Sequence, residues 1–313
     1  MLLTPLTAIS PLDGRYAEKT QQLRKIVSEY GLIFYRLRVE IDWLIALARE
    51  PKFTALTPFN DAELRWLNTL ESTFNETDAE KIKTLEKTTN HDIKAIEYYL
   101  REKCESHPTL KRAASFIHFA CTSEDINNLA YGLMLKTLRD TILHPALNKI
   151  IGALNTFAHD TADIPMLART HGQVASPTTL GKEFKNFAKR LETHVHYWSA
   201  IPISAKCNGA VGNFNAHVVA CPEVDWLAFS EQFVNAFGFR WTEHTTQIEP
   251  HDFLGQWCSA LSVCHSILLD LCRDCWGYIA LHYLTQKKTA HEVGSSTMPH
   301  KINPIDFENA EGN

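Results

Sequence analysis

Residues 256–286 read QWCSALSVCHSILLDLCRDCWGYIALHYLTQ, a stretch that is apolar on most faces of a helix. Its length would suit a membrane span, but Asp270, Arg273 and Asp274 lie in its middle, where charges are too costly in hydrocarbon. A helix with this pattern is typical of the centre of a bundle, surrounded by other helices or by neighbouring subunits. The stretch therefore predicts an all-α bundle and favours oligomerisation.

Three further helices are indicated around this centre. Apolar residues recur every three or four positions over residues 18–50, which predicts one long amphipathic helix. A second helix is expected from Thr122, where a capping-box pattern begins, toward Pro145. A third is expected to open at Ser176 and Pro177, with serine as the cap and proline at the first helical position. Strand-like alternation is scarce.

The composition is that of a globular protein, with a net charge of -5 over 313 residues. This negative balance argues against a nucleic-acid-binding surface, so an anionic substrate would have to meet local cations. No basic segment precedes an apolar run at the N-terminus, so we expect no secretory signal and a cytoplasmic protein. The cysteines are scattered through apolar segments, which predicts free thiols. Cys272 and Cys275 form an isolated Cys-x-x-Cys without a second pair, so no metal site is expected.

Short non-helical segments concentrate Arg, His, Asn, Thr and Ser in ways that simple bundle connections do not need. They are residues 11–16, 88–92, 121–125, 169–173 and 294–304. The last reads GSSTMPHKINP, in which glycine frees the backbone and two prolines restrict it, so a mobile loop is predicted whose serines face a ligand. An ordinary surface loop is the alternative, because these residue types dominate turns. Such a loop, however, has no need for a lysine and an asparagine at fixed distances from the serines.

The 294–304 loop resembles the signature loop of the fumarase, aspartase and argininosuccinase superfamily. The other segments, together with FIHFACTSEDINN at 116–128 and NGAVGNFNAH at 208–217, resemble the bacterial adenylosuccinate lyase family over essentially the whole chain. Fumarases and argininosuccinate lyases share the final loop but lack the segments at 13–16 and 89–92. The resemblance implies a superfamily-type core of long bundled helices, a smaller helical N-terminal domain, and a lyase that requires no cofactor and no metal.

The family's reaction dictates what the site must contain. Removing fumarate from a succinylamino purine compound requires a base on one side of the substrate and an acid on the other, with donors aimed at the carboxylate that receives charge. By resemblance Ser295 is the base, and Lys301, loop amides and exclusion of water would favour its alkoxide. His171 is the expected acid, because imidazole titrates near neutrality. His91 is the competing candidate, and we assign it to orientation and charge stabilisation.

Further residues are expected to bind the substrate. Arg15 can pair with an anion while Tyr16 adds a hydroxyl donor, although an exposed arginine in a turn is the alternative. Thr122 and Ser123 are explained by helix capping and also by contact with a succinyl carboxylate, and both explanations can hold together. The resemblance adds the remaining binding residues, which are Asn90, His91, Asp92, Gln247, Ser296, Lys301, Asn303 and Asn309. Asp92 would either orient a histidine or stabilise its own turn.

The resemblance also implies how the chain is organised. We expect a mainly helical N-terminal domain over residues 1–112, which carries Arg15, Tyr16, Asn90 and His91, and a central long-helix bundle over residues 113–313. The bundle is expected to be incomplete at its C-terminal end, because family members continue into a small C-terminal domain. A homotetramer with active sites shared between subunits is implied, with neither nucleic acid nor membrane as a partner.

The expected reactions are the cleavage of adenylosuccinate to AMP and of SAICAR to AICAR in the biosynthesis of purines, with fumarate as the common product. Two alternatives remain open. One is another fumarate-releasing lyase of the superfamily, which substrate tests would separate. The other is a catalytically silent helical scaffold, against which the intact His171 and Ser295 speak.

Overall fold

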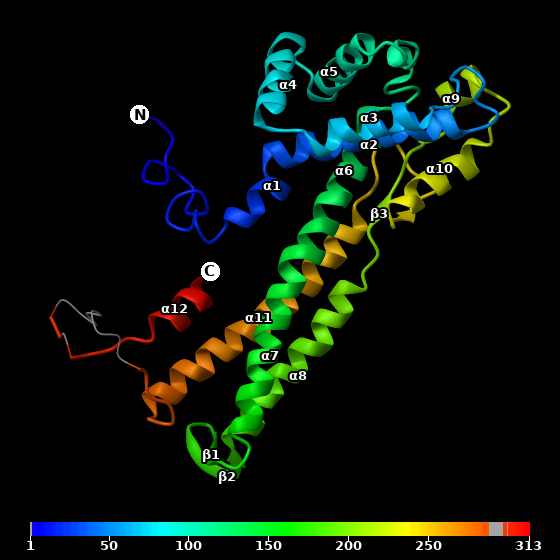
Figure 1. Cartoon of the computed structure of the whole chain (residues 1–313). Coiled ribbons are helices and arrows are strands. Elements are labelled where there is room, and N and C mark those ends of the chain that lie inside the picture. The colour runs from blue at the N-terminus through cyan, green and yellow to red at the C-terminus, as the bar shows by residue number, and fades with distance from the viewer. Residues whose placement is uncertain (1, 288–296, 299) are drawn as a thin grey trace. The chain divides into compact units, whose positions relative to one another are not determined.

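The structure is a computed structural model that describes residues 2–287, 297–298 and 300–313 (Figure 1). The chain divides into two compact units. The first comprises Met1–Leu143 and Pro202–Phe253, and the second comprises His144–Ile201 and Leu254–Asn313. The domain boundary predicted at residue 112 lies within the first unit and stays a prediction.

The first unit is built around α2 (Glu29–Arg49), which packs against helices α3, α4, α5 and α6. Large side chains of α2 such as Trp43, Leu37 and Leu44 are almost completely buried and form its core. Two residues each of β3 (Ser204–Ala205) and β4 (Arg240–Trp241) form a short parallel pair. The other elements are η1 (Gln21–Leu23), α1 (Arg24–Val27), α3 (Asp61–Ser72), α4 (Glu76–Thr89), α5 (Asp92–Ser106), η2 (Leu110–Phe116), α6 (Ser123–Leu138), η3 (Arg139–Leu143), α9 (Asn215–Ala220) and α10 (Trp226–Ala236).

The single helix predicted over residues 18–50 is wrong at its N-terminal end. The chain leaves the helical conformation at Ser28, which has φ -89° and ψ 174° and separates α1 from α2. The Ser28 hydroxyl accepts a hydrogen bond from the Gly31 amide at 3.3 Å and so caps α2. When a serine hydroxyl accepts a hydrogen bond from an amide of the following turn, it caps a new helix at that position and so interrupts the preceding one. The 3.6-residue periodicity of apolar residues contains no information about this hydrogen bond.

The second unit is a helical hairpin with one long partner helix. Helices α7 (His144–Asp160) and α8 (Leu180–Ser199) pack together and are joined through the antiparallel strands β1 (Pro165–Thr170) and β2 (Gln173–Thr179) (Figure 1). Helix α11 (Asp252–Ala280) contacts α8, where the rings of Trp198 and Trp257 lie 5.1 Å apart. Helix α12 (Ile305–Gly312) follows.

The predicted helix start at Ser176 and Pro177 is a second correction. Both residues lie in β2, where Pro177 pairs with Leu167, and α8 begins only at Leu180. The actual cap is Thr179, whose hydroxyl accepts a hydrogen bond from the Lys182 amide at 3.2 Å. Proline is tolerated in this ribbon because each strand of a two-stranded sheet is an edge strand, so the missing N–H breaks no ladder.

The helix predicted from Thr122 toward Pro145 is confirmed, and α7 continues beyond the proline. The π-helical turn η3 immediately precedes α7. A wider i→i+5 turn leaves room where proline removes a donor and crowds the preceding turn.

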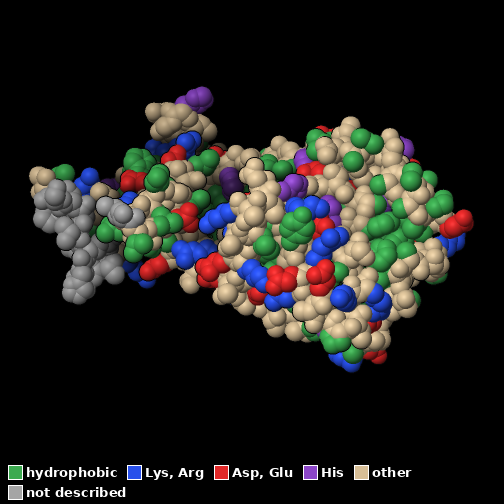
Figure 2. Space-filling model, turned by 90° about the horizontal axis from the view of Figure 1, so that it is seen from above, with side chains coloured by type: hydrophobic (Ala, Val, Ile, Leu, Met, Phe, Trp, Pro, Cys, Tyr) green, Lys and Arg blue, Asp and Glu red, His purple; other side chains and the backbone are tan. Residues whose placement is uncertain are grey.

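The all-α class predicted from the 256–286 stretch is confirmed, since β1–β2 and β3–β4 are the only sheets among the residues described. No helix in the described ranges is both long and apolar enough to cross a membrane. Helix α11 instead forms ion pairs through two of the three charges that argued against a span: Asp270 with Arg190 at 2.8 Å, and Arg273 with Glu311 at 2.7 Å. Figure 2 shows that positive and negative side chains are interspersed on the face drawn.

Candidate active site

The start of α6 brings together three predicted substrate-binding residues. Thr122 is the N-cap, and its amide donates to Asp125 Oδ2 at 2.8 Å in a capping box, while Ser123 opens the helix. Gln247 Nε2 donates a hydrogen bond to Thr122 Oγ1 at 3.2 Å. A helix N-terminus carries unpaired amides and a partial positive charge, so an anion can bind there. The structure thus joins Thr122, Ser123 and Gln247 at an anion-accepting helix end.

The start of α5 holds a second predicted group. Asn90 ends α4 in the left-handed region, with φ 51°, which asparagine tolerates better than most residues. His91 is the N-cap of α5, and its Nδ1 accepts a hydrogen bond from the Lys94 amide at 3.2 Å. This bond requires an unprotonated Nδ1 and so leaves Nε2 of a neutral ring as the donor. His91 and Asp92 keep about half of their side-chain surface exposed, 48% and 43%.

Arg36 on α2 links these two helix starts. Its Nη2 lies 2.7 Å from Asp92 Oδ2, and its Nε donates to Asn127 Oδ1 at 2.8 Å. Partial burial opposes ionisation of Asp92, but the Arg36 guanidinium and backbone hydrogen bonds together outweigh that effect and hold the pKa of Asp92 below its ordinary value. Asp92 is therefore ionised at neutral pH and paired with Arg36. The sequence left open whether Asp92 orients a histidine. The contact that would do so is longer than the contact with Arg36, since His91 Nδ1 lies 3.7 Å from Asp92 Oδ1.

A buried ion pair that the sequence did not reveal lies beneath the α6 start. Asp125 Oδ1 is 2.8 Å from Lys206 Nζ, and both side chains are completely buried. The carboxylate also accepts hydrogen bonds from the amides of Asn208 and Gly209 at 3.0 and 3.1 Å. Asn208 Nδ2 donates in turn to Thr245 Oγ1 at 2.8 Å, two residues before Gln247. This network ties the segment that carries Gln247 to the start of α6.

Three potential metal ligands meet in the same place. One ligand atom each from Cys121, Asp125 and Cys207 lie within 4.8 Å of one another. Burial raises the pKa of both thiols, which keeps them protonated, and the Asp125 carboxylate is already satisfied by Lys206 and backbone amides. The cluster is therefore explained by hydrogen bonding and charge pairing.

The proposed acid His171 occupies a turn in the second unit. Thr170 pairs with Gln173, so His171 and Gly172 form a two-residue hairpin loop with φ angles of 51° and 74°. Positive φ at both central residues is the geometry of a type I′ turn, which matches the twist of the flanking strands. The His171 side chain is exposed, and its ring makes no hydrogen bond within the described part of the chain.

The remaining predicted residues are distributed over both units. Arg15 is exposed and Tyr16 half-buried in the turns that precede η1. Lys301 and Asn309 are exposed in the second unit, Asn309 on α12, and the Asn303 carbonyl accepts a hydrogen bond from the Ile305 amide at 2.8 Å. Ser295 and Ser296 lie outside the described residues. Whether His171 and the loop residues meet the α5 and α6 starts stays a prediction.

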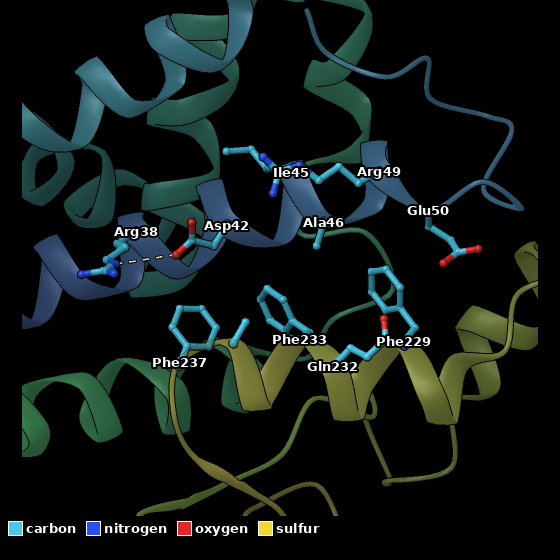
Figure 3. A pocket seen from close by; sticks show the side chains of 11 residues that line it. Arg38, Asp42, Ile45, Ala46, Arg49, Glu50, Phe229, Gln232, Phe233 and Phe237 are labelled. Carbon is cyan, nitrogen blue, oxygen red and sulfur yellow. Dashed lines mark ion pairs between the residues drawn. The ribbon is translucent and has the colours of Figure 1, made fainter. Parts of the chain in front are cut away.

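A separate pocket of about 400 Å³ lies between α2 and α10. Figure 3 shows Phe233 of α10 and Phe237, which directly follows this helix, across from Arg38 and Asp42 of α2. Burial raises the pKa of Asp42 to about 6, although Arg38, with its Nε 3.6 Å from Asp42 Oδ2, acts in the opposite direction. No residue predicted for catalysis or substrate binding lines this pocket, so it is not part of the candidate site.

Comparisons with known proteins agree with the family resemblance. A family model described as a lyase matches residues 14–313. The chain is 51% identical over 313 residues to the adenylosuccinate lyase of Escherichia coli strain K12, covering 100% of this chain and 69% of that protein. It is likewise 51% identical to the adenylosuccinate lyases of Vibrio cholerae and Legionella pneumophila strain Corby, again covering 69% of each.

A solved structure supports the fold alone. The crystal structure of 3-carboxy-cis,cis-muconate lactonizing enzyme from Pseudomonas putida aligns with a TM-score of 0.67 at 21% identity, covering 93% of this chain and 62% of that one. The sequence resemblance is therefore confirmed by 51% identity over the full chain, and the structural match agrees with the fold. The chain belongs to the adenylosuccinate lyase family of the fumarase/aspartase superfamily.

Proposed function

We propose that this chain is a carbon–nitrogen lyase that eliminates fumarate from adenylosuccinate, which yields AMP, and from SAICAR, which yields AICAR. The observation that carries the proposal is the meeting of Thr122, Ser123 and Gln247 at the start of α6, in a chain 51% identical to adenylosuccinate lyases. Both substrates carry a succinyl group whose two carboxylates need fixed donors. The proposed setting is the biosynthesis of purines in the cytoplasm.

The geometry suits the charge that develops in this reaction. When the proton beside a carboxylate is removed, the electron pair moves into that carboxylate, which becomes doubly charged. The amides of the first turn of α6, the Ser123 and Thr122 hydroxyls and the Gln247 amide are donors that gain strength as the charge grows. His91, held at the start of α5 with Nε2 as its free donor, is suited to orient a second polar group of the substrate.

The two proton carriers are proposed as Ser295 for the base and His171 for the acid. His171 sits on a short turn of defined geometry with its ring exposed, so it is available to a substrate or to a second subunit. Lys301 and Arg15 are exposed cations in this acidic chain and suit the anionic substrate. Tyr16, Asn90, Asp92, Ser296, Asn303 and Asn309 complete the proposed binding set.

The assembly is proposed to be a homotetramer whose active sites are shared between subunits. Support comes from α11, where Val263 and Trp276 stay 40% and 49% exposed although the helix is apolar on most faces. A helix that is apolar on most faces is expected to be covered by other helices or by neighbouring subunits, and these side chains remain uncovered within one chain. Sedimentation velocity at several protein concentrations tests this point, and a monomer at micromolar concentration contradicts it.

The decisive assay is fumarate release by the purified chain from adenylosuccinate, SAICAR, argininosuccinate and malate at matched subunit concentration. Activity confined to adenylosuccinate and SAICAR supports the proposal. Activity on argininosuccinate or malate would instead identify another fumarate-releasing lyase. No activity from a folded tetramer would leave the scaffold alternative.

The proton carriers are tested by paired substitutions. His171→Ala and Ser295→Ala should each lower kcat by about 10²–10⁴-fold, the usual effect of losing a general acid or base. His159→Ala, at an imidazole that is 90% exposed in the same unit, and Ser266→Ala, at an exposed serine of α11, serve as matched controls that should retain activity. Near-normal turnover in either catalytic variant, or an unchanged pH profile for His171→Ala, contradicts that assignment.

A further inference from the structure

One arginine connects the two helix starts of the candidate site. Arg36 is 5% exposed, and its guanidinium contacts Asp92 at the first position of α5 and Asn127 in the second turn of α6. Asn127 continues the network, since its Nδ2 donates to Glu124 Oε2 at 3.4 Å. Arg36 belongs to neither helix, so its contacts add a connection that the backbone of α5 or α6 does not provide.

The guanidinium makes this connection directional. It is planar, and its donors point in fixed directions, so contacts through Nη2 and Nε set two acceptors at a defined separation and angle. Because the group is almost fully buried, water cannot replace a lost contact without opening the packing between α2, α5 and α6. A shift of either helix start therefore breaks a charge-assisted hydrogen bond.

We propose that Arg36 is a positioning residue for the elimination reaction. It holds the His91–Asp92 start of α5 and the Thr122–Ser123 start of α6 at the spacing at which both contact one substrate. The inference rests on the proposed function of this site and extends it to a residue that does not itself touch the substrate. A residue with only a structural role would change stability and leave the kinetics of the folded protein intact.

The kinetic test uses Arg36→Gln, Arg36→Lys and Asn127→Leu. Misplacement of substrate-binding groups by about 1 Å lowers turnover by about 10²-fold, so we expect a loss of this order in kcat/KM for Arg36→Gln. Arg36→Lys keeps one cation but not two directed donors, and it should recover only part of the loss. Asn127→Leu should lower kcat/KM as well, and the double variant should lose less than the product of the two single losses, because both remove the same contact.

Arg112→Gln is the matched control. Arg112 donates to both oxygens of the buried Glu63 carboxylate at 2.7 and 3.2 Å in the same compact unit, between η2 and α3. The Arg112→Gln substitution should lower the unfolding midpoint but leave kcat and KM unchanged. If Arg36→Gln behaves like this control, with kcat and KM within about twofold of the unsubstituted chain, the inference is overturned.

Hydrogen exchange separates this inference from the proposed function. If the unsubstituted chain releases no fumarate from adenylosuccinate, the proposed function fails. The exchange rates of the amides at 92–95 and 123–126 still show whether Arg36 holds the starts of α5 and α6 in place. Faster exchange confined to these two turns in Arg36→Gln supports the role of Arg36 in holding them. Unchanged exchange there overturns it.

Discussion

The buried pair of Asp125 and Lys206 allows a quantitative test of the packing beneath the candidate site. The perturbation is Asp125→Asn, which preserves shape but replaces one acceptor oxygen with an NH₂ donor. If the amide oxygen takes the place of Oδ1, the new NH₂ takes the place of Oδ2. It then faces the amides of Thr122 and Gly209, which lie 2.8 and 3.1 Å from Oδ2 in the unsubstituted chain. If the side chain flips, the NH₂ faces the Lys206 ammonium and the Asn208 amide instead.

The magnitude follows from these contacts. The flipped orientation leaves two buried donors facing a donor, at about 1–3 kcal/mol each. In the other orientation the Thr122 amide faces a donor, whereas the Gly209 amide keeps an acceptor because it also lies 3.3 Å from Oδ1. In both orientations the Lys206 charge loses its partner. Removing one member of a buried pair typically costs about 3–5 kcal/mol, which is a large part of the total stability of a domain. The melting temperature should fall by about 6–20 °C, at roughly 2–4 °C per kcal/mol for a unit of this size. Lys206→Met should cost less, because three backbone amides still satisfy Asp125.

The assay is urea unfolding at neutral pH, followed by circular dichroism, for Asp125→Asn, Lys206→Met and the double variant. Asp140→Asn is the control, because its ion pair with Arg139 is 2.7 Å long but its side chain is 47% exposed, and exposed pairs contribute about 0–1 kcal/mol. The double variant should cost less than the sum of the single losses. A loss below about 1 kcal/mol in Asp125→Asn would refute the reasoning, since an uncompensated buried ammonium cannot be that inexpensive.

Three further predictions concern pH and packing. Hydrogen bonds from Arg112 hold the pKa of Glu63 at about 2, below the ordinary 4.5, so the ionised carboxylate stabilises the fold and Glu63→Gln should lower the melting temperature at pH 7. The difference in melting temperature between the variant and the unsubstituted chain should narrow as the pH falls from 4.5 toward 2. A difference that does not depend on pH contradicts this prediction. Burial raises the pKa of Asp42 from 3.8 to about 6, so the ionised carboxylate destabilises the fold at pH 7. Asp42→Asn should therefore raise the melting temperature at pH 7 but not below pH 3.8. A melting temperature lower than that of the unsubstituted chain at pH 7 contradicts this prediction. A methyl group on Gly181 would meet the Ala158 carbonyl oxygen at 2.2 Å, so Gly181→Ala should destabilise the unit by about 1–3 kcal/mol in urea unfolding. Gly152→Ala meets nothing within 4 Å on α7 and should stabilise by up to about 1 kcal/mol, and equal effects in the two variants would refute the packing argument.

Much of the secondary structure could be predicted because its signals are local. The apolar stretch at 256–286 predicted the helix observed as α11, and the capping pattern at Thr122 predicted the start of α6 within one residue. The failures at Ser28 and at Ser176–Pro177 have different causes. Ser28 caps α2 through the nearby Gly31 amide, a local contact that hydrophobic periodicity does not include. Pro177 instead pairs with Leu167 of β1, which keeps this segment in a strand.

The candidate site shows a similar division. Residue types and motif resemblance led to Thr122, Ser123, Gln247, His91 and Asp92, and the structure joins the first three at one helix start and the last two at another. Arg36, Asp125 and Lys206 were missed. In the sequence they are one arginine in an amphipathic helix, one acidic residue in a capping box and one lysine, each with an ordinary surface explanation. Only their burial, at 5%, 0% and 0%, marks them as unusual.

The sequence by itself determined the all-α class, the positions of the long helices α2, α6 and α11 apart from the break at Ser28, and the family, because each depends on local periodicity or on similarity of consecutive residues. The tertiary structure alone decided that Gln247 meets Thr122, that Arg36 bridges α5 and α6, and that Asp125 pairs with Lys206. These partners lie between 56 and 125 positions apart. Such pairings are chosen by the packing of whole helices, which buries a charge only where another part of the chain supplies its partner.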